Sequence, residues 1–322
     1  MPLAERYDAA LCDLDGVLYL GDDPVPHAAE SVAAARAVGQ RFAFVTNNAS
    51  RAPGAVAERL TDLGIPAVVE DVVTSGQAAA RTLAERLPAG ATVLVLGAEA
   101  LADEVRGVGL RPVRTVAEAG EEGPDAVVQG LAPTTSWADL SEATVALQRG
   151  ALWVTGNTDL TLPTSRGQLP GNGAFVEVLR RVTGREPLVA GKPDPALHHE
   201  SVERVGATRP LVVGDRLDTD VLGAVRGGAD SLLVLTGVTD VEGLLTAPAG
   251  SRPTYVGRDL RALLAPQPEV EVESETARCG ASTVTATGGV LRGDTGDDDG
   301  LRAAAALAWS LADAGRPVRW DG

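Results

Sequence analysis

Four short polar segments carry the side chains of this sequence that are able to do chemistry together. They are Asp13-Leu14-Asp15-Gly16, Thr46-Asn47-Asn48, Gly191-Lys192-Pro193 and Gly214-Asp215-Arg216-Leu217-Asp218-Thr219-Asp220. Clustered carboxylates without a cation would repel one another and raise each other's pKa. Mg²⁺ removes that repulsion because it binds carboxylates and also bridges to phosphate oxygens. The residue types at Asp13, Asp15 and Asp215 therefore predict Mg²⁺ and a phosphorylated substrate.

The spacing of the first two aspartates suggests a division of labour. Asp13 and Asp15 are two residues apart, so both face the same side if the preceding strand continues that far. One carboxylate is then able to attack phosphorus and form an aspartyl-phosphate, while the second protonates the leaving oxygen and later activates water. Thr46 and Lys192 are expected to stabilise the charge that develops on the phosphoryl oxygens.

Lysine occurs at a single position of the chain. Only Lys192 among the 28 basic residues is a lysine, and all the others are arginines. An ammonium is a compact point charge, whereas a guanidinium is a rigid planar fork. Its place between Gly191 and Pro193, directly after an apolar run, supports a specific role for this cation.

Each polar segment follows a short apolar run, and helical patterns lie between the runs, which is typical of buried parallel strands in βα units. These runs cover residues 9–12, 42–45, 188–190 and 211–213, and a fifth run over residues 231–235 completes the predicted sheet. Ligands of open α/β sheets bind beyond the carboxyl ends of the strands. We therefore expect the four segments to meet in one crevice.

The long stretch between Asn48 and Lys192 has strand and helix patterns of its own, which indicates an inserted domain. We predict an α/β protein with a Rossmann-like, doubly wound parallel-sheet core over residues 1–76 and 185–265. An inserted α/β cap domain covers residues 77–184, and a short C-terminal αβ appendage covers residues 266–322. In that appendage, Asp297-Asp298-Asp299 is expected to form a helix N-cap turn rather than a calcium site.

Taken together, these segments resemble the haloacid dehalogenase (HAD) superfamily of aspartate-nucleophile phosphatases, in the subclass IIA branch with a large inserted cap. The four polar segments match its four motifs in order, and the likeness extends over about residues 9–264. It includes the cap stretch from Gly156-Asn157-Thr158-Asp159 to Gly171-Asn172-Gly173.

The resemblance implies a role for each site residue. Asp13 would be the nucleophile and a metal ligand, Asp15 the general acid and base with its backbone carbonyl on Mg²⁺, and Asp215 the third protein ligand. Thr46, Asn47 and Lys192 would bind the phosphoryl group of the substrate. Asp220 would orient a metal-bound water, and a carboxylate that stabilises a helix N-terminus is the open alternative.

The implied activity is that of a Mg²⁺-dependent phosphoric monoester hydrolase with a small phosphorylated metabolite as its substrate. Similarity within the family makes glycerol 3-phosphate the first expectation, with 2-phosphoglycolate, pyridoxal phosphate, a sugar phosphate or 4-nitrophenyl phosphate as alternatives. The segment over residues 161–173, with Arg166, is the expected substrate-facing loop. A phosphometabolite-binding protein and a phosphoacceptor signalling protein are the non-catalytic alternatives, and the presence of Asp15 favours catalysis.

Composition excludes several other classes of protein. The formal net charge of −16 opposes nucleic acid as a partner, because that binding depends on neutralising phosphates. No apolar run is long enough to span a membrane, and Met1–Ala10 lacks the pattern of a signal peptide. Two cysteines among 322 residues fit a reducing compartment, so a cytoplasmic location is expected. Relatives often dimerise through their caps, which makes a homodimer one expected state.

Overall fold

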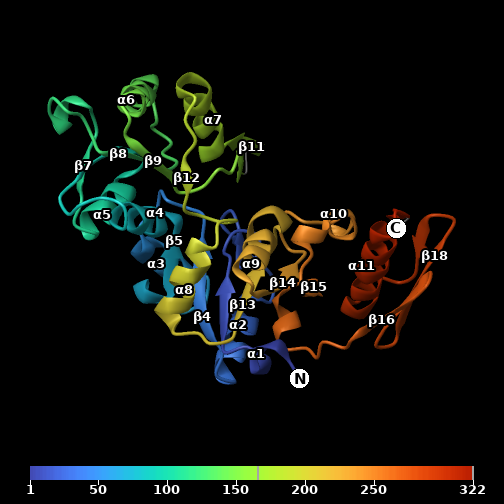
Figure 1. Ribbon diagram of the computed structural model, residues 1–322. Coiled ribbons are helices and arrows are strands. Elements are labelled where there is room, and N and C mark those ends of the chain that lie inside the picture. The colour runs from blue at the N-terminus through green and yellow to red at the C-terminus, as the bar shows by residue number, and fades with distance from the viewer. Residues whose placement is uncertain (165–166, 321–322) are drawn as a thin grey trace. The chain divides into compact units, whose positions relative to one another are not determined.

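The computed structural model describes residues 1–164 and 167–320, whose helices and strands are drawn in Figure 1. The chain divides into two compact units. The first consists of Met1–Phe44, Leu63–Ile65 and Val202–Gly322, and the second consists of Val45–Asp62 and Pro66–Ser201. The predicted boundaries of core, cap and appendage stay a prediction.

A parallel sheet forms the centre of the first unit, in the order β15-β14-β13-β1-β4. Its strands are β1 (Ala9–Cys12), β4 (Arg41–Thr46), β13 (Pro210–Gly214), β14 (Asp230–Val234) and β15 (Tyr255–Gly257). β4 continues into the second unit, where its neighbour is β5 (Val72–Thr74). Every residue of β1 is buried, as expected for a parallel strand covered on both faces. The strands predicted at residues 9–12, 42–45, 211–213 and 231–235 are thus confirmed.

Asp8 ties three segments together at the amino end of this sheet. Its Oδ2 accepts hydrogen bonds from the Thr208 backbone N–H (2.9 Å) and from Arg41 (3.0 Å), and its Oδ1 accepts from the Arg209 N–H (2.8 Å). Burial raises the pKa of this carboxyl, but the hydrogen bonds from Thr208 and Arg209 and the Arg41 charge outweigh it and lower the pKa to about 2. The ionised carboxylate therefore joins the residue before β1 to the first residue of β4 and to the segment before β13.

Short helices accompany the strands of the first unit, and they are marked in Figure 1. They are α1 (Leu3–Arg6), α2 (Ala28–Ala37), α9 (Leu222–Gly227) and α10 (Val241–Leu245). α3 (Pro53–Asp62) belongs to the second unit, and α8 (Ala196–Val205) begins there. Among the described residues, no helix combines the length and the apolar character that a membrane crossing requires.

The second unit contains a parallel sheet in the order β12-β9-β8-β6-β7. Its strands are β6 (Thr92–Leu96), β7 (Arg111–Val113), β8 (Ala126–Gln129), β9 (Leu152–Thr155) and β12 (Leu188–Val189). Its helices are α4 (Ser75–Ala84), α5 (Glu99–Gly107), α6 (Trp137–Gln148) and α7 (Asn172–Thr183), and β10 (Thr161–Thr164) pairs with β11 (Gly167–Pro170). Thr74 and Ser136 cap α4 and α6 by accepting the N3 backbone N–H.

One expected strand belongs to a different sheet. Residues 188–190 were predicted to end in the core sheet, but β12 pairs in parallel with β9, with Leu188 opposite Val154. The expectation was wrong because a three-residue apolar run does not specify its neighbour, which is chosen by long-range packing.

The C-terminal segment folds as a five-stranded sheet with one helix. The sheet order is β16-β17-β18-β19-β20, from β16 (Val270–Glu273), β17 (Thr276–Cys279), β18 (Ser282–Thr287), β19 (Val290–Arg292) and β20 (Arg319–Trp320). α11 (Asp298–Asp313) buries an alanine-rich face against Ala277, Val284 and other apolar side chains. The strand and the helix expected in this segment are confirmed, and Asp297 caps α11 by accepting the Gly300 N–H at 2.7 Å.

Candidate active site

Three buried carboxylates lie together beside the sheet of the first unit. Asp13 follows β1, Asp215 follows β13, and Asp220 lies in the helical turn Leu217–Val221. One oxygen of each lies within 4.8 Å of the others. The three residues are only 9%, 0% and 1% exposed. Three buried carboxylates repel one another unless a cation neutralises them. Hard oxygen donors are the ligands that Mg²⁺ prefers, so this donor set fits the predicted cofactor.

Asp215 is held in a backbone clamp made by Gly16, Gly237 and Val238. The Val238 N–H donates to Asp215 Oδ2 at 2.6 Å. A Cβ on Gly237 would overlap Oδ2 and lie 2.6 Å from the Asp215 carboxyl carbon, and a Cβ on Gly16 would also lie 2.6 Å from that carbon. Gly16 has a φ of 89°, which a side chain would strain. The clamp thus fixes the orientation of the Asp215 carboxyl group and with it the position of its other oxygen, Oδ1. It leaves no room for a methyl group on Gly16 or Gly237.

Residues Gly237 and Val238 were not among the predicted site residues. The sequence shows Thr236-Gly237-Val238 only as the polar end of a strand, which is the pattern of an ordinary turn. Thr236 adds to the arrangement by donating its hydroxyl to the Gly16 carbonyl at 2.5 Å. The clamp is therefore recognised from the three-dimensional structure and not from the local sequence around Gly237.

Asp220 is packed against the loop that carries Asp215. Its Oδ2 accepts the Arg216 N–H at 3.2 Å, and a Cβ on Gly214 would overlap the Asp220 carboxyl group. The sequence left two roles open for Asp220, and the structure places its carboxylate in the buried group with Asp13 as well as in the turn before α9.

Asp15 differs from these carboxylates because its side chain is exposed. Its backbone forms an isolated bridge with Tyr19, and the next residue, Gly16, donates its N–H to the Tyr19 carbonyl at 2.8 Å. The regular strand ends before Asp13, so Asp13 and Asp15 do not share the alternation of one continuous strand.

The second unit holds the other predicted site residues. The Lys192 N–H donates to Asn47 Oδ1 at 2.8 Å, and Asn47 Nδ2 donates to the Lys192 carbonyl at 3.1 Å. Asn47 Nδ2 also donates to Asp159 Oδ2 at 3.2 Å. Both N–H groups of the Asn47 carboxamide therefore donate to protein acceptors. The backbone N–H of Asn47 is the donor of this residue that we consider for a ligand. Lys192 itself is 3% exposed.

Thr46 ends β4 and starts the turn that carries Asn47. Its Oγ1 accepts the Asn48 N–H at 3.1 Å, and Asn48 Oδ1 accepts the Ser50 N–H at 2.7 Å. These two bonds give the turn a fixed shape. Arg166, named above in the expected substrate-facing loop, lies outside the described residues.

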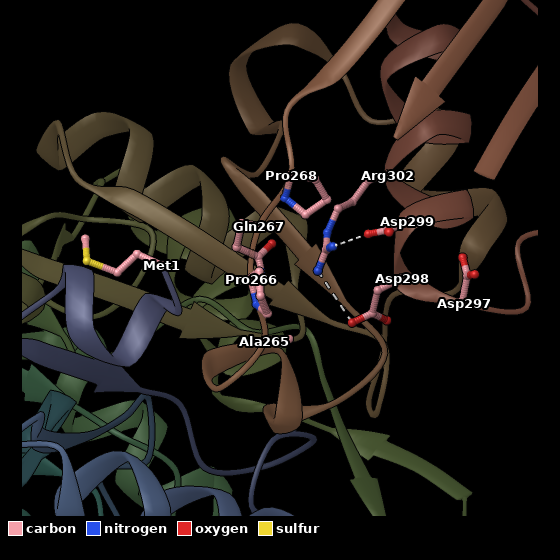
Figure 2. Close-up of a pocket in the computed structure, with 9 residues that line it drawn as sticks. All are labelled: Met1, Ala265, Pro266, Gln267, Pro268, Asp297, Asp298, Asp299 and Arg302. Carbon is pink, nitrogen blue, oxygen red and sulfur yellow. Dashed lines mark hydrogen bonds and ion pairs between the residues drawn. The ribbon is translucent and has the colours of Figure 1, made fainter. Parts of the chain in front are cut away.

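A separate pocket of about 560 Å³ lies in the first unit, and Figure 2 shows its lining. Arg302 reaches from α11 toward Asp299, at 2.8 Å, and toward Asp298, at 3.5 Å, and it donates to the Val256 carbonyl at 3.0 Å. Arg302, Asp298 and Asp299 all belong to α11, so their ion pairs lie within the helix, and the bond from Arg302 to the Val256 carbonyl joins α11 to β15. The pocket shares no lining residue with the carboxylate group around Asp13.

Comparison with known proteins gives consistent matches along the chain. A family profile described as haloacid dehalogenase-like hydrolase matches residues 10–111, and a second profile, described as HAD-hydrolase-like, matches residues 189–263. The D-glycerol 3-phosphate phosphatase of Mycobacterium tuberculosis is 49% identical, over 98% of this chain and 91% of that protein. The acid sugar phosphatase of Staphylococcus saprophyticus is 35% identical, over 81% of this chain and 98% of that protein.

Solved structures match as well. The crystal structure of a glycerol phosphate phosphatase from Mycobacterium tuberculosis in complex with magnesium has a TM-score of 0.85 at 47% identity, covering 100% of this chain and 94% of that one. A p-nitrophenyl phosphatase from Archaeoglobus fulgidus has a TM-score of 0.73 at 31% identity, covering 80% and 98%. With its motifs, its sheet and these relatives in agreement, the chain belongs to the haloacid dehalogenase-like hydrolase family.

Proposed function

We propose that this protein is a Mg²⁺-dependent phosphatase that hydrolyses glycerol 3-phosphate to glycerol and phosphate. The observation that carries the chemistry is the buried group of Asp13, Asp215 and Asp220, which needs a cation and is drawn from the first and fourth motifs. The choice of substrate is supported by 49% identity, over 98% of this chain, to a relative that is named for that substrate.

Asp13 and Asp215 are the side chains that would hold Mg²⁺, together with the backbone carbonyl of Asp15. The carboxylate oxygens of Asp13 and Asp215 are hard donors, and both residues are buried. When bound, the ion supplies positive charge to the phosphoryl oxygens and to the attacking carboxylate. Asp220, packed beside them, adds to the negative potential of the site and orients groups there.

In the first chemical step, an Asp13 oxygen forms a bond to phosphorus and the bond from phosphorus to the ester oxygen breaks. Asp15 donates its proton to that oxygen, which leaves as the hydroxyl of glycerol. The product on the enzyme is an aspartyl-phosphate at Asp13. The exposed side chain of Asp15 is suited to meeting a substrate that enters from solvent.

In the second step, Asp15 accepts a proton from water while the water oxygen attacks phosphorus. The bond between Asp13 and phosphorus breaks, and inorganic phosphate is released with both aspartates restored. Atoms and charges balance over the cycle, because the water supplies the hydroxyl of phosphate and the proton of glycerol.

The phosphoryl oxygens are bound by Thr46, Asn47 and Lys192 in this proposal. Lys192 contributes an ammonium with little exposure to water, where its attraction to phosphate is stronger than in bulk solvent. Because both hydrogens of the Asn47 carboxamide already have protein acceptors, Asn47 would act through its backbone N–H. Thr46 would act through its hydroxyl.

Phosphate release from a panel of phosphoesters tests the proposal. Purified wild type and Asp13→Asn are assayed on glycerol 3-phosphate, 2-phosphoglycolate, pyridoxal phosphate, a sugar phosphate and 4-nitrophenyl phosphate, with Mg²⁺ and with a chelator. We expect Mg²⁺-dependent release by wild type alone, with the highest kcat/KM for glycerol 3-phosphate. A higher kcat/KM for another ester would replace the substrate, and no release from any ester would reject the phosphatase.

Two further properties belong to the proposal. We infer a cytoplasmic location, and we infer a homodimer in which the exposed Val178 and Val182 of α7 take part in the subunit contact. Sedimentation of wild type and of Val182→Glu measures the second property, and a monomeric wild type would reject it.

A further inference from the structure

Asp159 follows β9 in the second unit, and its carboxylate reaches back to the second motif. We infer that Asp159 is a positioning residue, which orients the carboxamide of Asn47 so that Asn47 fixes the backbone of Lys192 for phosphate binding. The inference rests on the proposed function, because it assigns the purpose of that positioning to the phosphoryl group.

The Asn47 carboxamide contacts both the Lys192 backbone and the Asp159 carboxylate. The carboxamide accepts the Lys192 N–H at 2.8 Å and donates to the Lys192 carbonyl at 3.1 Å. This is the pairing that the backbone of a neighbouring β-strand makes. A carboxamide rotated by half a turn has almost the same shape but exchanges donor and acceptor. In that orientation, Oδ1 would face both the Lys192 carbonyl and the Asp159 carboxylate, which lies 3.2 Å from Nδ2. Asp159 thus favours the orientation that holds Lys192.

Hydrogen bonds hold the backbone of Asp159 in a fixed position. Its N–H donates to Asn157 Oδ1 at 3.1 Å, and its carbonyl accepts the Gly173 N–H at 2.9 Å. The first turn of α7 is pressed against this segment, because a Cβ on Gly171 would overlap the Asp159 carbonyl oxygen and a Cβ on Gly173 would lie 2.9 Å from the Asp159 carbonyl carbon. A carboxylate on such a rigid backbone is able to orient a neighbour without losing much entropy of its own.

The same segment also holds the Asn47 backbone. Asn157 Nδ2 and the Ser75 hydroxyl both donate to the Asn47 carbonyl at 2.6 Å. Asn157 is held in turn by Asn172, whose Nδ2 donates to the Asn157 carbonyl at 2.6 Å. Residues 157–159 therefore fix both the main chain and the side chain of Asn47, which is more than packing alone requires.

The loop that contains Gly191 packs closely against Gly156 and Asn47, so it has no room to shift. A Cβ on Gly191 would overlap the Gly156 carbonyl oxygen and lie 2.6 Å from Asn47 Oδ1. The place of the Lys192 backbone is therefore set by Asn47, and with it the place of the only ammonium side chain of the sequence. Misplacing a binding group by about 1 Å can weaken its effect by about 100-fold.

The test measures phosphate binding in full-length Asp159→Ala, with Asp159→Asn as the conservative variant. Thr158→Ala is the matched control, because Thr158 is the exposed neighbour in the same segment. In the presence of Mg²⁺, each protein is assayed for KM and kcat on glycerol 3-phosphate and for inhibition by inorganic phosphate. Circular dichroism and thermal unfolding confirm that each variant is folded.

We expect Asp159→Ala to raise KM and to weaken inhibition by phosphate about tenfold, with a smaller change in kcat. Asp159→Asn keeps an acceptor oxygen and should recover most of the loss, and Thr158→Ala should match wild type. Should Asp159→Ala fail to fold, Asp159→Glu carries the same expectation, because it keeps the charge but moves the acceptor by one methylene.

Unchanged KM and phosphate inhibition in a folded Asp159→Ala would overturn the inference, and so would an Asp159→Asn that recovers nothing. These results differ from a failure of the proposed function, in which wild type itself would release no phosphate from glycerol 3-phosphate.

Discussion

Replacing Gly237 by alanine tests the clamp around Asp215 with a single added methyl group. The new Cβ would lie 2.6 Å from the Asp215 carboxyl carbon, whereas ordinary contacts begin at 3.4 Å, and it would lie 2.7 Å from the Gly16 Cα. The carboxyl group must therefore retreat by at least about 0.8 Å or turn away from the Val238 N–H. Either movement takes one ligand of the predicted cation out of place.

The expected loss follows from the size of this displacement. A misplacement near 1 Å costs up to about 100-fold, and sharing the movement with the backbone leaves about a tenfold weaker Mg²⁺ affinity. At a Mg²⁺ concentration 100 times the wild-type Kd, binding stabilises the folded protein by about 2.7 kcal/mol. The variant would retain about 1.4 kcal/mol of that stabilisation, so its Mg²⁺-induced rise in Tm should be smaller by about 2 °C for a chain of 322 residues.

Thermal unfolding with and without Mg²⁺ measures this difference without any turnover, and titration calorimetry gives the Kd directly. Gly250→Ala is the matched control, because a Cβ at that position of the first unit meets nothing within 4 Å. Equal Mg²⁺ affinity in Gly237→Ala and wild type, with both proteins folded, would refute the clamp. Equal losses in Gly237→Ala and Gly250→Ala would refute its specificity.

Three further outcomes are expected. Asp13→Asn should abolish phosphate release but remain folded, because an amide is a poor nucleophile; a phosphate assay beside circular dichroism checks this, and residual turnover would remove Asp13 from its role. Lys192→Arg should raise KM at least about tenfold, because a planar guanidinium does not replace an ammonium at a site only 3% exposed; steady-state kinetics with a near-normal KM would contradict it. Asp8→Asn should lower the free energy of unfolding by about 1 kcal/mol at pH 7. Because the pKa of Asp8 is lowered to about 2, its stabilisation is complete above the unfolded pKa of about 3.9 and disappears as the pH falls toward 2, so urea unfolding should show the two proteins converging over that range.

The parts of the site that follow a strand locally were predictable from the sequence. The apolar runs before Asp13, Thr46 and Asp215 became β1, β4 and β13, because a buried parallel strand reads as a continuous apolar segment. The same reasoning failed for residues 188–190, where β12 has two residues and pairs with β9. A run that short contains no information about its neighbour.

The contacts that orient the site were not predictable in this way. Val238 reaches Asp215 across 23 positions, and Asn47 reaches Asp159 across 112. Neither pair has a spacing that matches a helix or strand period. A glycine after a strand, such as Gly237, usually indicates a turn and only rarely a close contact with a distant side chain. Such partners are selected by tertiary packing, which a single sequence does not display.

The pairing of Asn47 with Lys192 has a consequence for how the protein is made. The two residues are 145 positions apart, and a ribosome adds about 5–20 residues per second, so Asn47 waits about 7–30 s for its partner to be synthesised. Between them the second unit has a sheet of local parallel pairs, which is able to form first and shorten the loop that must close. In the proposed mechanism, catalysis would therefore begin only after the inserted segment has folded, and a chain that stops before Gly237 would lack the Asp215 clamp as well. If Lys192 and Asp215 act as proposed, nascent and truncated chains would not hydrolyse phosphorylated metabolites.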